Sequence, residues 1–584
     1  MTDNMTDKQA SRGAPMTKVG VAGVAVASEG ILDRHGWEEA NATNSPVTVL
    51  SASWFGVKGD GVTDDTAAFQ AALNAASGKK LYVPKQEGAH YLTGQLYIPG
   101  NIVLELAPGT VIQAVDTLRV TAPYERLIRI LNVSNVRIVG NGAVFRMNKS
   151  AYPAGEQAHI FDIGGSDNVT IEQVNANDSG GDGFYIGNYQ ATNSYCRNIV
   201  LRDCRADNNR RQGLSVISVD GLLVENCTFT NTIGTNPQAG VDIEPNGPTD
   251  RLKKIRLINC VSEGNKGRGF VSMIKKLSTA SERIDIIFQN CVSRNNAFGF
   301  ATVYGKDGTD AAQGEVKYID CLAEYEKWSG FFELSSSADS VRTTYIRCTA
   351  YNCNTNNGTE AALSYAASFF ISTVASEARS SAGNSHFYNC RSIDDRTPSF
   401  IRRGFATYAL EGFTITDLVY RDCESVGHTV SPFEFDPHTR NVRVEQTASA
   451  SYPQISTGAV GLNRLGGTIA NLGAIEDVLL TLPPAAAVPN LKLPYRNANA
   501  DTTLDGRDNH LIVDASAQPV IVSMPPASTV NGMKFTIKKA DSGTNPVQIT
   551  ASGSETIDGG CTVVLTDAGE FRSFLSIGTA WITM

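Results

Sequence analysis

The chain has 584 residues, of which 42% are hydrophobic and 19% are charged, and its formal net charge is −9. This composition is that of a folded protein, and the length is sufficient for two or more domains. The acidic balance gives no basic surface for nucleic acid or an anionic membrane, and the sequence contains no run of 18 apolar residues that would predict a transmembrane helix.

Residues 1–45 are expected to be an anchor or a flexible segment. They lack the basic, apolar and cleavage regions of a secretory signal peptide. We therefore expect synthesis in the cytoplasm without such a signal, followed by release through cell lysis or another route.

The first predicted element is a helix over about 66–76, with Asp64 or Asp65 as its N-cap. A stack of strands has an open end that must be covered, and this helix is suited to cover it. The residues expected to pack on the first strands are Ala67, Phe69, Ala72 and Leu73.

Two series of residues recur along the next 300 positions. Eight cysteines each follow a short apolar strand, and they are Cys204, Cys227, Cys260, Cys291, Cys321, Cys348, Cys390 and Cys423. Six glycines each begin a strand of the pattern glycine-apolar-any-apolar, and they are Gly183, Gly213, Gly240, Gly269, Gly299 and Gly330. Both series have a period near 30 residues, which indicates stacked coils with at least two strands each.

These coils predict an all-β fold, a right-handed parallel β-helix over residues 46–450. The sequence between the strands has no amphipathic segment of helix length, which excludes an alternation of strands and helices. Each coil of a β-helix buries its inner face on its neighbours, and equivalent cysteines then stack in one column inside. Stacked cysteines point the same way, so we expect them to be reduced.

The C-terminal region contains a second repeat. VLLTLPPAAAVPNLKL begins at Val478, and VIVSMPPASTVNGMKF begins 42 residues later at Val520. Alternating apolar residues on both sides of a Pro-Pro turn predict strand, turn and strand. We expect a first β unit over 451–507 and a β-sandwich over 508–584 that serves in trimerisation or carbohydrate binding.

Two stretches resemble known proteins. FGVKGDGVTDDTAAFQAAL, at residues 55–73, resembles the N-terminal signature of the pectate-lyase-like superfamily of β-helix proteins. NGMKFTIKKA and GSETIDG resemble the C-terminal β-sandwich modules of phage tail fibres and tailspikes. Together they imply a tailspike-type depolymerase, a homotrimer that binds a bacterial polysaccharide and attaches to a virion tail or baseplate through its N-terminus.

Candidate catalytic residues come from strand alternation, which points the residue two places after each repeated glycine outward. Most of this outer face is apolar or small, but one strand carries Asp242 and Glu244. Residues two apart on a strand are roughly 6.6 Å apart, a spacing that favours an inverting glycosidase over a retaining one. The alternative is a pair of solvated surface carboxylates.

Neighbouring coils bring further groups to this face: Asp182 as a third catalytic candidate, and Tyr185, Arg210, Arg211, Gln212 and Arg268 as candidates for substrate binding. Arginines can bind a sugar carboxylate through two hydrogen bonds, or they can form salt bridges within the protein. Trp328 can provide a platform for a sugar ring, or it can pack against a loop or a partner chain. The stretches NNRRQGLSV and AGVDIEPN resemble a region that recurs in phage and bacterial β-helix polysaccharide enzymes.

Three functions therefore stay open. The first is hydrolysis of a bacterial surface polysaccharide by paired carboxylates. The second is a lyase that uses an arginine or tyrosine base, with calcium held by Asp182, Asp242 and Glu244. The third is a receptor fibre that binds glycan without cleaving it. A hydrolase of this kind needs no cofactor, and the cysteine spacing predicts no zinc site.

The outward apolar residues also motivate the predicted homotrimer. They are Val271, Met273, Ala301, Val303, Phe332 and Leu334. A single copy is expected to leave them exposed, and an exposed apolar patch of that size normally marks an interface or a binding groove.

Overall fold

The computed structural model describes residues 48–85, 90–121, 123–153, 156–304, 312–334, 341–358, 366–373, 381–445, 469–470, 478–481, 495–504, 510–530 and 534–583. The chain divides into two compact units, one that ends at Ala487 and one that contains the residues from Val488 to the C-terminus. The anchor expected over residues 1–45 lies outside the described residues. The helices of the described part are too short or too polar to cross a membrane.

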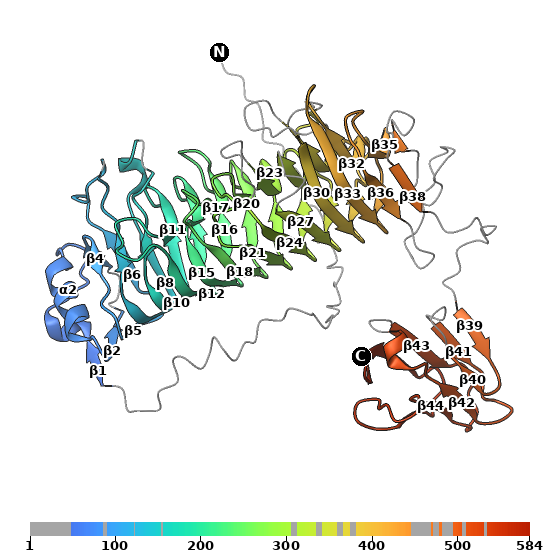
Figure 1. Ribbon diagram of the computed structural model, residues 1–584. Helices are drawn as coiled ribbons and strands as arrows, with labels where there is room; N and C mark the ends of the chain where they lie inside the picture. Colours follow the sequence, from blue (N-terminus) through green and yellow to red (C-terminus); the bar gives the residue numbers. More distant parts are fainter. Residues whose placement is uncertain are drawn as a thin grey trace, which may run out of the picture. The chain divides into compact units, whose positions relative to one another are not determined.

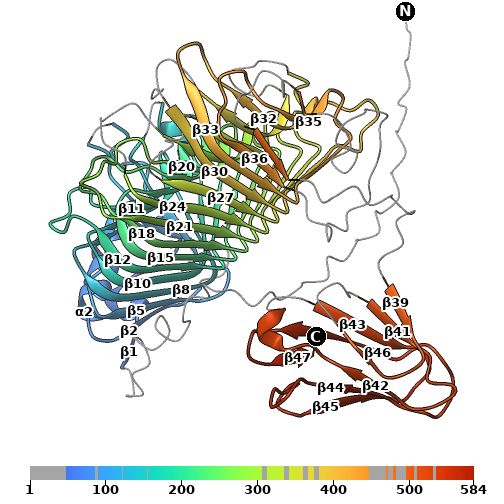
Figure 2. The same ribbon diagram turned by 45° about the vertical axis from the view of Figure 1, so that its right-hand side comes forward.

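The unit that ends at Ala487 is a β-helix whose strands pair in parallel, coil upon coil, from β1 to β38 (Figures 1 and 2). This confirms the predicted parallel β-helix. One face is a 13-stranded sheet. The other 25 strands form two further faces that are joined into one sheet, because the long strands β8 and β10 each pair with strands of both faces.

The 13-stranded sheet consists of β4 (Leu96–Tyr97), β7 (Ile128–Leu131), β9 (Phe161–Gly164), β11 (Asp182–Gly187), β14 (Gln212–Val216), β17 (Ala239–Ile243), β20 (Arg268–Met273), β23 (Phe298–Val303), β26 (Phe331–Leu334), β29 (Ala367–Ser372), β32 (Arg403–Tyr408), β35 (Ser431–Glu434) and β37 (Ile469–Ala470). The second face consists of β1 (Val49–Ser51), β2 (Lys80–Val83), β5 (Ile102–Leu106), β8 (Ser134–Arg146), β10 (Asp167–Asn177), β12 (Cys196–Arg202), β15 (Val219–Glu225), β18 (Leu252–Ile258), β21 (Ile284–Gln289), β24 (Gly314–Ile319), β27 (Arg342–Ile346), β30 (Ser381–Tyr388), β33 (Thr414–Arg421), β36 (Val442–Glu445) and β38 (Val478–Thr481). The third face adds β3 (Tyr91–Thr93), β6 (Val111–Ala114), β13 (Arg205–Asp207), β16 (Thr228–Thr230), β19 (Val261–Glu263), β22 (Val292–Arg294), β25 (Leu322–Glu324), β28 (Thr349–Tyr351), β31 (Arg391–Ile393) and β34 (Glu424–Val426). Two 3-10 turns are η2 (Ala52–Phe55) and η3 (Lys149–Ala151).

Helix α2 (Thr66–Ala75) lies at the first coils, as predicted (Figure 1). Phe69, Ala72 and Leu73 are buried, but Ala67 is exposed because it lies on the opposite side of the helix. Asp64 accepts a hydrogen bond from the Thr66 N–H at 2.9 Å. The carboxylate of Asp65 instead binds the N–H groups of residues 58 and 59, so it stabilises the preceding turn.

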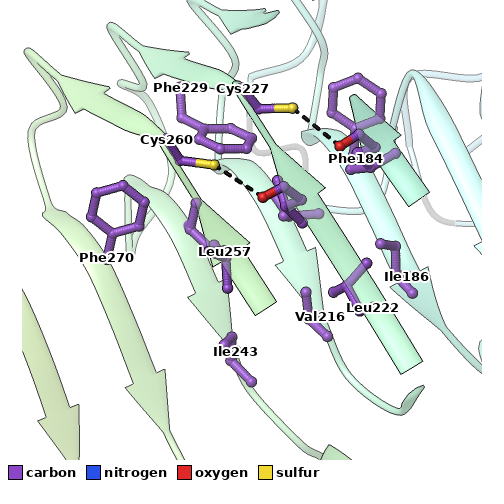
Figure 3. Packing of buried hydrophobic residues seen from close by; sticks show 14 of the residues in the cluster. Phe184, Ile186, Val216, Leu222, Cys227, Phe229, Ile243, Leu257, Cys260 and Phe270 are labelled. Atoms are coloured by element: carbon purple, nitrogen blue, oxygen red, sulfur yellow. Dashed lines mark hydrogen bonds between the residues drawn. The ribbon is translucent and has the colours of Figure 1, made fainter. Parts of the chain in front are cut away.

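Columns of like side chains fill the interior of the β-helix. The cysteines of the repeat are free and buried, and Cys227 and Cys260 each lie within hydrogen-bonding distance of a carbonyl oxygen of the preceding coil, at 3.5 and 3.4 Å (Figure 3). Beside them, stacked rings run from Phe270 through Phe300 to Phe331, with centroids 5.0 and 5.1 Å apart. The predicted column of reduced, inward-facing cysteines is therefore confirmed.

The outer face of the 13-stranded sheet differs from the expectation that led to the trimer. Val271, Ala301, Phe332 and their neighbours form a second apolar cluster that is buried within the single chain. The repeat pattern correctly places these side chains outside the coils. It contains no information about whether that outward face meets solvent. Exposure of this face therefore gives no support to a trimer.

The C-terminal unit has a core of its own between two sheets. One sheet has strands β39 (Tyr495–Ala498), β41 (His510–Val513), β43 (Lys534–Lys539), β46 (Phe571–Ser576) and β47 (Trp581–Thr583). The other has β40 (Thr502–Thr503), β42 (Val520–Ser523), β44 (Val547–Thr550) and β45 (Thr562–Leu565), and the 3-10 turn η5 (Ala527–Thr529) lies between β42 and β43.

The boundaries of the C-terminal region differ from those expected at 450 and 508. Strands β37 and β38 pair with β35 and β36, so they extend the β-helix to Thr481. Strands β39 and β40 belong to the C-terminal sheets, although they precede residue 508. The repeat at Val478 and Val520 predicted strands at both places, but the same pattern fits a coil and a sandwich. Pro483 lies outside the described residues.

Candidate active site

The candidate site lies on the outer face of β11, β14 and β17. The backbone register places Tyr185, Ser215 and Asp242 side by side on these consecutive strands. Three residues earlier on the same two strands, Asp182 is aligned with Gln212. Coils are spaced about 4.8 Å apart, so side chains from adjacent strands of this face can contact one another.

Asp242 is completely buried. Its Oδ2 atom accepts a hydrogen bond from Nε2 of Gln212 at 3.1 Å, and its Oδ1 atom has no hydrogen-bond partner among the described residues. Burial, and after it the nearby charge of Glu244, raises the pKa of Asp242 to about 7. This side chain is therefore suited to hold a proton near neutral pH.

Asp182 is also completely buried, on the coil before Gln212. Its Oδ2 atom accepts a hydrogen bond from the Ser215 hydroxyl at 2.8 Å and lies 3.2 Å from Nδ1 of His159. Burial raises the pKa of Asp182 to about 7, although the charge of Arg211 opposes this. The cluster thus contains two carboxyl groups that are protonated much more readily than a solvated aspartate.

Arg211 joins the buried and the accessible parts of the cluster. Its Nη2 atom lies 3.1 Å from Oε2 of Glu244, and its Nη1 atom lies 3.7 Å from Oδ2 of Asp182. The side chain of Glu244 is 30% exposed, whereas those of the two aspartates are inaccessible. Glu244 is therefore the accessible carboxylate of this cluster, and Arg211 stabilises its charge.

His159 and Tyr185 form one side of the site. Their rings are stacked, with centroids 4.8 Å apart. Burial, and then the positive charge of Arg126, lowers the pKa of His159 well below its usual value, so this imidazole is neutral. Its Nδ1 atom accepts the backbone N–H of Asp182 at 3.1 Å, which fixes the imidazole against that strand.

The remaining predicted residues lie at the border of the cluster. Arg210 turns away, and its guanidinium donates a hydrogen bond to the carbonyl oxygen of Pro153. The guanidinium carbon of Arg268 lies 5.8 Å from the ring centroid of Phe298, and the ring of Trp328 stacks with Phe298 at a centroid distance of 6.5 Å. Arg268 is close enough to Asp242 for their charges to interact. Trp328 precedes the strand that lies three coils beyond the strand of Asp242.

Sequence reasoning missed several members of this cluster. His159 and Ser215 are not among the residues predicted for the site. Asp162, which the register aligns with Tyr185, contacts Arg129 at 2.8 Å and Arg126 at 3.3 Å, and all three are buried. A continuous run of polar side chains from β9 to β17 was the available signal, because the later coils carry apolar residues there.

The described residues contain no group of three or more His, Cys, Asp or Glu side chains arranged to hold a metal ion. At the candidate site, the guanidinium of Arg211 supplies the positive charge between Asp182 and Glu244.

Comparison with known proteins agrees with the fold. Residues 128–316 match the family described as the right handed beta helix region. The pre-neck appendage protein of Bacillus phage B103 is 25% identical over 290 residues, which are 47% of this chain and 32% of that protein. A capsule K30/K69-specific depolymerase of Klebsiella phage K5-2 is 38% identical over 93 residues, which are 14% and 11% of the two chains.

Among solved structures, a family 28 exopolygalacturonase of Yersinia enterocolitica has a TM-score of 0.49 at 16% identity, and the match covers 69% of this chain and 79% of that chain. The chain spans about a third and about a tenth of the length of the two phage relatives. It is a right-handed parallel β-helix protein, and the expected resemblance to phage proteins of this class, a depolymerase among them, is confirmed.

Proposed function

We propose that this protein is a depolymerase that hydrolyses glycosidic bonds inside a bacterial surface polysaccharide such as a capsule, an exopolysaccharide or an O-antigen. The observation that carries the proposal is the pairing of buried Asp242, whose pKa is raised to about 7, with the arginine-bound carboxylate of Glu244. Glycosidases need one protonated and one ionised carboxyl group on either side of the scissile bond.

Asp242 and Glu244 differ in proton affinity, as this chemistry requires. Asp242 would protonate the oxygen of the leaving sugar, and Glu244 would remove a proton from the attacking water. The two residues are separated by one position of β17, roughly 6.6 Å along the strand, which leaves room for a water molecule and favours inversion. Asp182 would act as a second buried acid that raises the proton affinity of the cluster.

Access to Asp242 requires movement of a neighbouring side chain, because this residue has no exposed surface. Arg211 is suited to this, since it contacts both Glu244 and Asp182 and is itself partly exposed. A carboxylate on the substrate would attract its guanidinium and loosen both contacts. Tyr185, Gln212 and Arg268 would then complete the walls of the sugar-binding site.

A lyase is the second candidate. The pKa of Arg268 is lowered by burial, and its Nε atom has no hydrogen-bond partner among the described residues. A guanidinium that loses its proton more easily could act as the base of a β-elimination. Calcium would then be expected between the carboxylates, where Arg211 now supplies the positive charge.

The phage relatives support a location on a virion, with a bacterial polysaccharide as the partner. Attachment to a tail or baseplate protein through the N-terminal region is proposed with it. A homotrimer is proposed on the resemblance of the C-terminal sequence to tailspike modules. A receptor fibre that binds glycan without cleaving it remains an outcome of the following experiment.

A panel of purified bacterial capsules, exopolysaccharides and O-antigens would test the activity. We expect the protein to shorten at least one of them, measured by size-exclusion chromatography and by mass spectrometry of the products. Binding without shortening would identify a receptor fibre, and neither binding nor shortening across a broad panel would contradict the proposal.

Asp242→Asn and Glu244→Gln should each lower turnover on that substrate at least a hundredfold, because a general acid or base typically contributes 10²–10⁴-fold. Circular dichroism and melting temperature would show that both variants are folded. Glu225→Gln is a matched control, since Glu225 also pairs with an arginine, Arg202 at 3.0 Å, but lies on another face. Near-native turnover in both test variants would place the active site elsewhere.

A further inference from the structure

A shallow groove crosses the turns that follow β19, β22, β25 and β28. Its volume is about 460 Å³, and its lining includes Lys266, Asn295, Tyr325, Lys327, Thr355 and Asn356. Four consecutive coils contribute, so the groove is roughly 14 Å long at a spacing of about 4.8 Å per coil. This size is within the usual range of ligand sites.

The groove begins at the border of the candidate active site. Lys266 precedes Arg268 by two residues, and these turns lead into the strands of the 13-stranded sheet. The N–H of Ala297, which also lines the groove, donates to the carbonyl oxygen of Gly267 at 2.8 Å. The groove therefore lies on the turn that leads directly into the strand of Arg268.

Tyr325 has an unusual backbone conformation in this groove. On seven coils, the first residue after the strand has a positive φ, between 51° and 69°. The residues are Asp178, Asn208, Asn231, Gly264, Asn295, Tyr325 and Asn352. Asp, Asn and Gly adopt this left-handed conformation readily, whereas a bulky aromatic residue does so rarely. Tyr325 alone of the seven is unsuited to its backbone, and such outliers often mark functional positions.

The ring of Tyr325 is held in an exposed position. The residue is 40% exposed, and its ring meets that of Tyr351 edge to face at a centroid distance of 5.6 Å. The Tyr351 hydroxyl in turn donates a hydrogen bond of 2.5 Å to Asp395. The aromatic surface is therefore fixed in place and available to the apolar face of a sugar ring.

The charge of the groove is positive. Lys266 and Lys327 are both exposed, and neither forms an ion pair with another described residue. On the adjoining strands, Arg294 and Glu324 pair with each other at 3.1 Å, and Glu263 is aligned with Arg294. Of the other carboxyl groups near these turns, Glu326 is buried and Asp395 accepts the hydrogen bond from Tyr351. The two lysine ammonium groups thus remain able to bind anionic groups of a ligand.

We propose that this groove is a binding site for a stretch of acidic glycan, with a sugar ring stacked on Tyr325 and its anionic groups bound by Lys266 and Lys327. Binding of glycan in the groove does not depend on the proposed function. The further claim that this glycan is the chain cleaved at Asp242 and Glu244 rests on the proposed function. The site would hold the polysaccharide several sugars away from the reacting bond.

The test measures binding in the full-length Asp242→Asn protein, so that no probe is cleaved. The probes are acidic and neutral oligosaccharides prepared from purified bacterial polysaccharides, with oligogalacturonate included. We expect at least one acidic probe to bind, more weakly as salt increases. Lys266→Gln combined with Lys327→Gln, and separately Tyr325→Asn, should each weaken that binding about tenfold or more.

Tyr325→Asn separates binding from folding, because asparagine occupies the same position on neighbouring coils. We expect its melting temperature to be unchanged or higher, and a purely structural tyrosine would give a lower one. Lys254→Gln is the control for the lysines, since Lys254 is exposed on β18, outside the groove. It should leave affinity unchanged.

The proposal is overturned if no acidic probe binds, or if binding persists undiminished in both groove variants. Groove-dependent binding without cleavage by the unaltered protein would contradict the proposed hydrolysis but retain this site. The groove variants could instead cleave the polysaccharide with the same affinity and the same dependence on chain length as the unaltered protein. That result would contradict this site alone.

Discussion

The chemistry of individual residues in the candidate site depends on burial. A solvated aspartate is ionised at neutral pH, but Asp182 and Asp242 have pKa values raised to about 7 because no water reaches them. The guanidinium of Arg211 opposes this shift without cancelling it. Glu244 follows the last residue of β17, and it is partly exposed and paired with Arg211. Two residues of one short stretch therefore carry two different kinds of carboxyl group.

The raised pKa of Asp242 predicts a pH-dependent stability. The group binds a proton more tightly in the folded state than in the unfolded state, where its pKa is near 3.8. Its stabilising contribution is therefore complete below about pH 4 and is lost as the pH rises through about 7. Asp242→Asn cannot ionise, so its stability relative to the unaltered protein should rise by about 2.5 kcal/mol between pH 5 and pH 8.

Unfolding curves of both proteins at the two pH values measure this difference. Glu326→Gln provides a comparison, because burial raises the pKa of Glu326 to about 8 on a coil outside the carboxyl cluster. The stability of Glu326→Gln relative to the unaltered protein should likewise rise between pH 5 and pH 8. An identical pH dependence for Asp242→Asn and the unaltered protein would mean that Asp242 is ionised in the folded state.

At the scale of elements, the repeated coil is the unit that determines the fold. From Cys204 to Cys423, each coil carries one cysteine of the column. The registers of the 13-stranded sheet also align one inward and one outward residue of each coil with the next. Columns of like residues therefore follow from the repeat itself. A single substitution in a column affects two interfaces, one with each neighbouring coil.

The cysteine column predicts a simple thiol count. All eleven cysteines are free, ten are buried and Cys561 is exposed. A thiol reagent should therefore react promptly with about one thiol in the native protein, and with all eleven after denaturation without reductant. Fewer than eleven thiols in the denatured protein would reveal a disulfide and contradict the column.

Much of the arrangement of strands and coils could be predicted from the sequence. The spacing of the cysteines and glycines gave the coils, the inward and outward positions, and the strand with Asp242 and Glu244. The sequence did not reveal that the outer face from Val271 to Phe370 is buried, because the repeat distinguishes only inward from outward positions. For the same reason it gave neither the contact of His159 with Asp182 nor the turn of Arg210 towards Pro153.

At the scale of the whole molecule, the β-helix and the C-terminal unit each have a separate core. The outer apolar face of the β-helix is buried within one chain, so it creates no need for a partner. The proposed trimer therefore depends on the resemblance of the C-terminal sequence to tailspike modules, and the contacts would be expected in that unit.

Light scattering on the full chain should give three times the chain mass of 62.4 kDa. A shorter chain that ends at Ala487, the limit of the β-helix unit, should associate less tightly. A monomeric mass at micromolar concentration would refute the trimer. Unchanged association of the shorter chain would place the contacts along the β-helix.

The central claim is that Asp242 and Glu244 hydrolyse a glycosidic bond, and the origin of the oxygen in the products tests it most directly. Digestion of a susceptible polysaccharide in ¹⁸O-labelled water, with brief exposure and mass spectrometry, should place one labelled oxygen at each new reducing end. β-Elimination would leave the product oxygens unlabelled and create a double bond that absorbs ultraviolet light. Unlabelled, unsaturated products would contradict the account.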